Sequence, residues 1–181
     1  QPGFTQYGSF AEYVEIKNAD FNLISLPNEI SFEVAAALGC RFATAFRGLT
    51  ARGGIKAGDL VAVIGCGGVG LSAVMIAKAF GAKVIAVDVN EVALENAKSA
   101  GANFIFNSER AIEEIQKLGG AHISIDALGH QKTAEIAVKS LRRLGKHIQL
   151  GLLLTPSGTT PIPMARAIAY ELDLLGSHGM A

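Results

Sequence analysis

Four glycines within six residues form the part of the chain best suited to bind an anion. Gly65, Gly67, Gly68 and Gly70 fit the pattern GxGxxG, whose main-chain N–H groups hold a diphosphate. In that pattern the first glycine permits a tight turn, Gly67 lets the backbone approach the anion, and Gly70 lets a helix pack against a strand. The helix that follows adds about 0.3–1 kcal/mol per charge through its dipole. The spacing therefore predicts a dinucleotide-binding turn.

An acidic residue lies at the distance from these glycines that a ribose-binding carboxylate requires. Asp88 ends the apolar run KVIAVD, residues 83–88, eighteen residues after Gly70. A carboxylate at the end of a second strand accepts both hydroxyls of an adenosine ribose and repels a 2′-phosphate. Residues 89–91 offer no arginine that would bind such a phosphate. We therefore predict NAD, rather than NADP, as the cofactor.

Two other interpretations of the glycine-rich stretch stay open at this point. Residues 60–77 are eighteen consecutive uncharged positions, near the lower limit for a membrane-spanning helix. The four glycines, and Asp59 and Lys78 at the two ends, argue against a membrane span. The second alternative is a tight turn between a strand and a helix in a sheet that binds nothing.

From residue 57 onwards, strand-like apolar runs alternate with helix-like segments that are closely followed by glycine. This alternation is typical of an α/β fold with a doubly wound parallel sheet and helices on both faces, the Rossmann architecture. We expect six strands, at residues 60–65, 83–88, 104–106, 123–128, 146–152 and 172–176. We expect four helices, at residues 69–80, 90–100, 109–118 and 131–144. The expected N-caps are Asn90 and Ser108, and the expected capping glycines are Gly81, Gly101, Gly119 and Gly145.

The first 56 residues lack this alternation. Residues 9–17 alternate imperfectly, which predicts a half-exposed strand, and Pro27 interrupts the chain before a helix that begins near Ser31. Residues 35–38 and 43–49 are expected to be helical. Because so short an arm cannot form a core of its own, we expect it to pack on the larger domain or on residues outside this sequence. The predicted parts are therefore residues 1–56 and 57–181.

Composition narrows the class of protein. Half of the 181 residues are hydrophobic, enough for one core and part of a second, and sixteen basic residues balance sixteen acidic ones. No cluster of Lys and Arg indicates a nucleic-acid partner. The start, Gln1-Pro2-Gly3-Phe4, does not resemble a signal peptide and lacks an initiator methionine, which suggests a piece of a longer protein. Two cysteines form no disulfide framework, so we expect a cytoplasmic location and no membrane partner.

Three ordered motifs resemble the zinc-type medium-chain dehydrogenases, the alcohol dehydrogenase family. They are AALGCRFATAFRGL at residues 36–49, AGDLVAVIGCGGVG at residues 57–70 and KVIAVDVN at residues 83–90. The resemblance covers nearly the whole chain. It implies that residues 57–181 are an NAD-binding Rossmann domain and that residues 1–56 are the remnant of a GroES-like catalytic domain. The parent protein would be a homo-oligomer that transfers hydride between an alcohol or polyol and nicotinamide with a catalytic zinc, whereas this piece alone would bind NAD weakly and have no activity.

The same resemblance implies roles for particular residues. Cys40 matches the third catalytic zinc ligand, and Thr44 matches a residue beside the nicotinamide ring. The remaining cofactor contacts would come from the glycine turn and from strand ends, at Val69, Leu128, Gly129, Gly151, Leu152 and Ser177. A catalytic zinc needs three protein ligands, and the other two would precede Gln1. Without the resemblance, Cys40 would more often be a small buried apolar residue and Thr44 an ordinary helix threonine, and Cys66 only fills a variable position of the turn.

Histidines and rival functions complete the expectations. His122 and His147 are expected at the surface near strand starts, while His130 and His178 follow strand ends on the binding side as solvated loop residues. A zinc-free quinone or enone reductase of the same superfamily is one rival, although such enzymes usually lack the cysteine at position 40. A non-catalytic dinucleotide-binding module is the other. Residues 172–176 are expected at a sheet edge, where they could pair with a second subunit.

Overall fold

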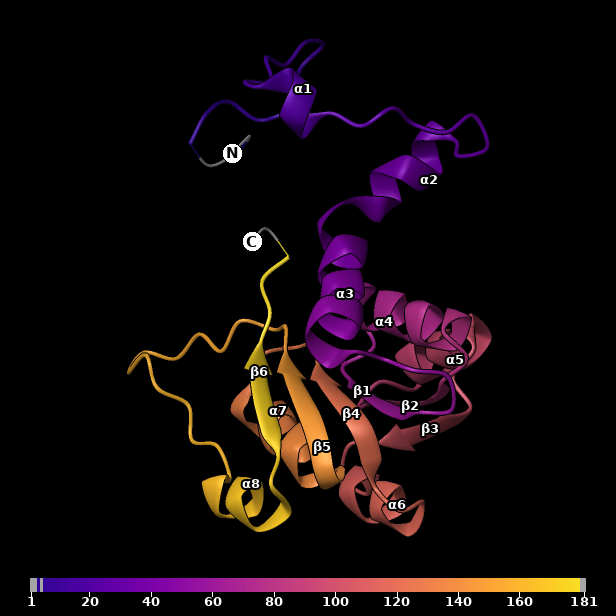
Figure 1. Ribbon diagram of the computed structural model, residues 1–181, viewed down its shortest axis with the longest axis vertical. Helices are drawn as coiled ribbons and strands as arrows, with labels where there is room; N and C mark the ends of the chain where they lie inside the picture. The colour runs from indigo at the N-terminus through magenta and orange to yellow at the C-terminus, as the bar shows by residue number, and fades with distance from the viewer. Residues whose placement is uncertain (1–2, 4, 180–181) are drawn as a thin grey trace. The chain divides into compact units, whose positions relative to one another are not determined.

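The computed structural model describes residue 3 and residues 5–179, which form two compact units (Figure 1). The units are Gln1–Ala36 and Ala37–Ala181. Gln1, Pro2 and Phe4, on which the expectation of no signal peptide rests, lie outside the described part of the chain. Within the described part, no helix combines the length and apolar character needed to cross a membrane.

The larger unit is built on one parallel sheet of six strands in the order β3-β2-β1-β4-β5-β6. The strands are β1 (Leu60–Ile64), β2 (Lys83–Asp88), β3 (Phe104–Asn107), β4 (Ala121–Asp126), β5 (Leu141–Gln149) and β6 (Asp173–Gly176). Figure 1 shows the arrows of β4, β5 and β6 side by side. The order reverses beside β1, so two halves of the sheet meet there. This arrangement confirms the predicted six-stranded Rossmann fold.

Helices cover both faces of this sheet because its central strands are apolar on both sides. Val61 and Val63 of β1 pack in one core, and Ala62 and Ile64 pack in another. The first core contains residues of α4 (Gly68–Ala79) and α5 (Glu91–Ala100), and the second contains residues of α6 (Ala111–Lys117) and α7 (Gln131–Lys139). Residues 60–77, for which a membrane span was the alternative, therefore form the buried strand β1 and the first turns of α4, a helix that covers one face of the sheet.

Two predicted helix starts have different outcomes. Asn90 caps α5 as predicted, because its Oδ1 accepts the N–H groups of Val92 and Ala93 at 2.8 and 3.3 Å. Ser108 does not cap α6, which begins only at Ala111. The preceding residue, Asn107, accepts the N–H of Glu109 at 3.1 Å instead, so the chain makes a side-chain-bonded turn before the helix begins.

The sequence-based boundary between α7 and β5 is wrong. The helix predicted over residues 131–144 ends at Lys139, and β5 begins at Leu141 rather than at residue 146. Leu141 pairs with Ala121 of β4, and a register shift follows before Lys146 pairs with Ile123. Leu144, not Gly145, takes the left-handed conformation in this irregular stretch, whereas Gly81, Gly101 and Gly119 have positive φ angles. Helix α8 (Met164–Tyr170), which contacts β5, was not predicted.

Residues 32–53, at the end of the smaller unit and the start of the larger one, are helical. The helix expected near Ser31 is α2 (Phe32–Ala37), and Ser31 Oγ accepts the N–H of Val34 at 3.4 Å. It is followed by η1 (Leu38–Phe42), which is kinked at Gly39, by α3 (Ala43–Arg47) and by η2 (Gly48–Gly53). The fully buried side chains of Ala45 and Leu49 belong to the same core as α4. Residues 43–53 therefore support the sheet and the glycine turn.

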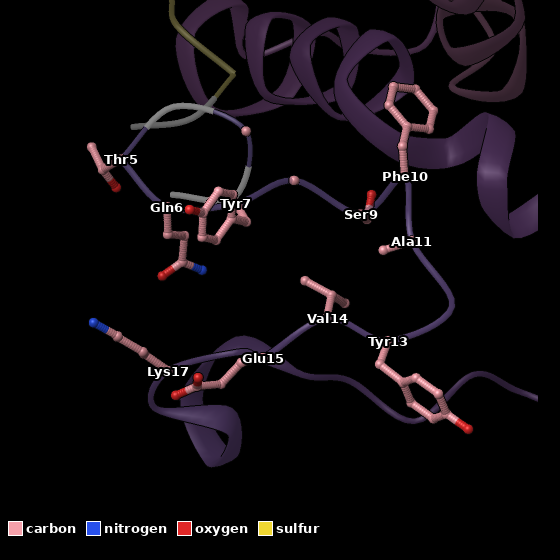
Figure 2. A pocket seen from close by; sticks show the side chains of 12 residues that line it. Thr5, Gln6, Tyr7, Ser9, Phe10, Ala11, Tyr13, Val14, Glu15 and Lys17 are labelled. Carbon is pink, nitrogen blue, oxygen red and sulfur yellow. The ribbon is translucent and has the colours of Figure 1, made fainter.

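The smaller unit contains α1 (Ala19–Asn22), and the strand predicted over residues 9–17 is absent from its described residues. A strand needs a neighbour to pair its backbone groups, and this stretch finds none in the unit. Twelve residues of positions 3 and 5–17 instead surround an open hollow of about 1340 Å³ (Figure 2). Tyr7 and Tyr13 are 96% and 89% exposed, and Figure 2 shows the rings of Phe10 and Tyr13 pointing in different directions. These aromatic side chains therefore form no core with one another.

Candidate dinucleotide-binding site

The turn between β1 and α4 uses its glycines in three different ways. Gly65 has a φ of +92°, a conformation that favours glycine. A Cβ at Gly67 would meet no atom within 4 Å, so the backbone there borders open space. A Cβ at Gly70 would overlap the carbonyl oxygen of Gly65, so only glycine allows α4 to pack this closely. The turn thus leaves room for a ligand at Gly67 and at the uncapped start of α4.

Asp88 ends β2 with its carboxylate against this turn. Its Oδ2 accepts the N–H of Cys66 at 2.7 Å, and its Oδ1 accepts the N–H of Asn90 at 3.0 Å. The side chain is half-buried, and an ionised carboxylate has about four acceptor positions, so acceptor capacity remains for a ligand. Burial, together with the charge of Asp88, raises the pKa of the neighbouring Cys66 thiol to about 12. Cys66 is therefore a protonated, buried side chain without nucleophilic character.

A cavity of about 180 Å³ lies beyond Asp88, at the carboxyl end of the sheet. Its apolar walls include Ile64, Val87, Leu128 and Ile136. Polar residues that line it are Asp88, Ser108, His130, Lys132 and Thr133. Ser108 is 8% exposed, and its Oγ has no hydrogen-bond partner among the described residues. An apolar slot with few polar groups suits a flat heteroaromatic ring.

A second carboxylate, Asp126, ends β4 and organises the loops on the other side of β1. Its Oδ1 accepts the N–H groups of Leu128 and Gly129, both at 3.0 Å, and its Oδ2 accepts Nε2 of Gln149 at 2.8 Å. The same Nε2 donates to the carbonyl of Gly151 at 2.8 Å. Asp126 is fully buried, so these donors take the place of water as its hydrogen-bond partners. The predicted contact residues Leu128 and Gly129 are thus held by the carboxylate itself, whereas Gly151 is held by Gln149 and by its N–H, which donates to the main-chain carbonyl of Asp126 at 2.9 Å.

The hydrogen-bond chain continues from Gln149 to two buried side chains of β4 and β5. Because Nε2 of Gln149 donates, its Oε1 accepts Nε2–H of His147 at 3.1 Å. Nδ1 of His147 then accepts the hydroxyl of Ser124 at 3.2 Å. Burial lowers the pKa of His147, so the ring is neutral in this chain of bonds. The expectation that His147 lies at the surface is therefore wrong, because the ring is only 3% exposed.

The other histidines have local structural roles. His122, also expected at the surface, is partly buried and accepts the N–H of Leu60 through Nδ1 at 3.0 Å, and burial lowers its pKa. His130 caps α7, with Nδ1 accepting the N–H of Lys132 at 3.1 Å and Thr133 completing the capping box. His178 is exposed. Of the four histidines, only His130 lines the cavity.

Comparison with known proteins places this architecture in a family. The sequence pattern that defines zinc-binding dehydrogenases matches residues 68–181. An alcohol dehydrogenase of Geobacillus stearothermophilus is 35% identical over 97% of this chain and 51% of its own length. This chain belongs to the zinc-binding dehydrogenase family. The acryloyl-coenzyme A reductase of Sulfurisphaera tokodaii, 34% identical over 93% of the chain and 49% of its own length, is another relative.

Solved structures agree with this assignment. The alcohol dehydrogenase of the hyperthermophilic archaeon Aeropyrum pernix has 32% sequence identity and a TM-score of 0.83. The match covers 98% of this chain and 52% of that one. The chain therefore spans about half the length of the curated relatives it matches.

The zinc-binding dehydrogenase family implies a metal, and the described residues do not suffice to hold one. Cys40 is an exposed free thiol whose Sγ lies 4.0 Å from Oγ1 of Thr44. Within residues 3 and 5–179, no three side chains of His, Cys, Asp or Glu are grouped to bind a metal. A catalytic zinc takes three protein ligands, so Cys40 could supply only one of them. Thr44 is mostly buried, with Gly179 packed against its hydroxyl.

The structure brings most of the predicted cofactor residues to the carboxyl ends of the strands of the sheet. Val69 lies in the first turn of α4, and the N–H of Ser177 donates to the carbonyl of Gln149 at 3.1 Å, while Leu152 is 64% exposed. Sequence reasoning missed Asp126 and the cavity residues Ser108, Lys132 and Thr133. An acidic residue in the apolar run HISIDALG, placed like Asp88 at a strand end, was the available signal for Asp126.

Proposed function

We propose that this chain binds NAD and is the cofactor-binding part of an NAD-dependent alcohol or polyol dehydrogenase. The observation that carries the proposal is the Asp88 carboxylate, held 2.7 Å from the N–H of Cys66 beside a glycine turn that is open at Gly67. A carboxylate for ribose next to free amides for a diphosphate is what a dinucleotide requires. Membership of a dehydrogenase family supports it independently.

Each part of the cofactor has a complementary part of the site. The diphosphate would lie at Gly67 and the N-terminus of α4, the ribose at Asp88, and the adenine in the 180 Å³ cavity. The loops tied together by Asp126 would carry the nicotinamide end, through main-chain groups of Gly129 and Gly151. Bound NAD supplies the chemistry by accepting hydride from an alcohol carbon. The residues of this chain fix its position and exclude water from it.

The proposal commits to NAD over NADP. The charge of Asp88 would repel a 2′-phosphate and accept the hydroxyls of an unmodified ribose. Lys132 also lines the cavity and is the residue that could favour the phosphorylated cofactor. We infer that Asp88 dominates, because its carboxylate is fixed by two main-chain N–H groups, whereas no bond of the Lys132 ammonium is found in the described part of the chain.

Metal-assisted turnover would need residues beyond those described. Cys40 would provide one thiolate ligand of a catalytic zinc in the parent protein, which would activate the substrate alcohol. We therefore propose that the isolated chain binds cofactor without turning over substrate. The second candidate function is reduction of an activated alkene, because one relative of similar identity is an acryloyl-coenzyme A reductase.

Calorimetric titration of the 181-residue chain with NADH and with NADPH tests the cofactor assignment. We expect NADH to bind at least about tenfold more tightly than NADPH, which corresponds to about 1.4 kcal/mol. Asp88→Ala should remove most of this preference while the chain stays folded. Failure of the wild-type chain to bind NADH, or tighter binding of NADPH, would contradict the proposal.

Location and assembly are further parts of the proposal. We propose that the protein is cytoplasmic, in agreement with its two free cysteines. We also propose a homodimer that pairs through β6, the last strand in the order of the sheet. Light scattering on the longer parent protein should give a multiple of the monomer mass. A monomer at high concentration would rule the pairing out.

A further inference from the structure

A positively charged side chain that the cofactor assignment leaves unused lies against the glycine turn. The side chain of Arg41 packs on Gly68, the first residue of α4, so closely that a Cβ there would overlap its Cδ. That Cβ would lie 2.8 Å from Nη1 and 3.3 Å from Nε of the guanidinium. Arg41 is exposed, and none of the hydrogen bonds and ion pairs found among the described residues involves its side chain.

The backbone explains how the arginine reaches this position. Gly39 interrupts the helical conformation with a ψ of −138°, and the chain then continues through η1 into α3, which packs on α4. Arg41 is therefore carried by an element that is fixed against α4. Because Gly68 has no side chain, the aliphatic part of Arg41 can lie directly on the backbone of the turn.

Positive charge gathers at the start of α4. The N-terminus of α4 carries a partial positive charge and free N–H groups, and no side chain caps it. The guanidinium places a full positive charge beside it, and Gly67 borders open space at the same point. A doubly charged diphosphate in that space would interact favourably with both positive groups. The unpartnered hydroxyl of Ser108 in the adjoining cavity independently indicates a ligand at this edge.

We propose that Arg41 binds the diphosphate of the dinucleotide, opposite the main-chain amides of α4. This inference rests on the proposed function and adds a residue to it. The planar fork of a guanidinium can donate two parallel hydrogen bonds to phosphate oxygens, which a lysine ammonium cannot match in geometry. Arg41 thus supplies a charged contact to the phosphates, while Asp88 selects the sugar.

Three ligands that share the adenosine group but differ in phosphate separate this role from general support of the fold. The wild-type chain, Arg41→Gln and Arg41→Lys are titrated calorimetrically with NADH, ADP and adenosine. Lys98→Gln is the matched control, because it removes the same charge from an exposed side chain in the last turn of α5. If Arg41 makes a charged hydrogen bond of ordinary strength, Arg41→Gln should lower the affinity for NADH and for ADP by about tenfold or more. Adenosine binding should stay within about twofold of wild type, and Arg41→Lys should be intermediate.

The outcomes distinguish the two levels of the argument. If the wild-type chain binds no NADH, the proposed function itself is wrong. If the wild-type chain binds NADH, and Arg41→Gln binds NADH and ADP as tightly as the wild type does, the cofactor assignment stands and the role of Arg41 is refuted. Equal weakening of adenosine and ADP would also refute it, because the arginine would then act on the shape of the site. An effect of Lys98→Gln as large as that of Arg41→Gln would show that only net charge matters.

Discussion

The two strands that flank β1 each end in an aspartate, and the two aspartates have opposite surroundings. Asp88 at the end of β2 is half-buried, accepts two main-chain N–H groups and borders the cavity. Asp126 at the end of β4 is fully buried and accepts three donors that all belong to the protein. The first half of the sheet therefore leaves acceptor positions of a carboxylate open beside the cavity, and the second uses a carboxylate to hold its own loops.

This difference shows that residue type and place in the fold do not decide a role by themselves. What decides it is how many of the acceptor positions the protein itself fills. Gln149, with its amide fixed by His147, brings an extra donor to Asp126, and Asp88 has no comparable neighbour among the described residues. We therefore expect the two aspartates to differ in what their removal destroys.

The largest expected effect is that of Asp126→Ala. Loss of this carboxylate leaves the N–H groups of Leu128 and Gly129 without their buried acceptor and removes one of the two acceptors of the Gln149 amide. We expect the free energy of unfolding to fall by about 3 kcal/mol or more, measured by urea denaturation. Asp88→Ala is the matched variant, and it should cost roughly 1 kcal/mol of unfolding free energy while weakening NADH binding enough to remove most of the preference over NADPH. Equal stability losses for the two variants would remove the distinction drawn between them.

Glycines in the first half allow the same comparison on a smaller scale. Gly70→Ala places a Cβ against the carbonyl oxygen of Gly65, so backbone must move, and we expect a loss of about 1–3 kcal/mol in unfolding free energy. Gly67→Ala meets only open space but replaces the glycine N-cap of α4, so the unfolding free energy should fall by about 1 kcal/mol or less, while the methyl group should obstruct the proposed diphosphate. Thermal unfolding and NADH titration of both variants measure the two effects. Full NADH affinity in Gly67→Ala would mean that no anion approaches there.

What could be predicted from the sequence follows the same division. The glycine turn, β1, β2 and Asp88 were predictable because they depend on residue types within thirty positions of one another. The role of Asp126 was not, because its partner Gln149 lies on another strand and reaches it only through the pairing of β4 with β5. The start of β5 at Leu141 depends on the same pairing, which overrides the helix-like run LRRLG. Residues 9–17 have the alternation of a strand but no neighbouring strand in their unit.

The smallest expected effect is a pH dependence of the unfolding free energy. It should come from the second half of the sheet, which contains β4 and β5. Burial lowers the pKa of His147 below the usual value of about 6.5, which the unfolded chain retains. Between these two pKa values the unfolded state binds more protons than the folded state. The free energy of unfolding therefore falls as the pH drops below about 6.5, by up to about 1.4 kcal/mol per pH unit, until the folded pKa is reached.

Urea denaturation at pH 7.5, 6.5 and 5.5 measures this dependence in the wild-type chain and in His147→Gln. The variant should lose less stability over this range, because a neutral amide replaces the group that must stay unprotonated. Some dependence will remain, since burial also lowers the pKa of His122 and contributes with the same sign. If His147→Gln kept the full slope, the neutral ring would not be what links Ser124 to Gln149, and the buried chain of bonds behind Asp126 would need a different order of donors.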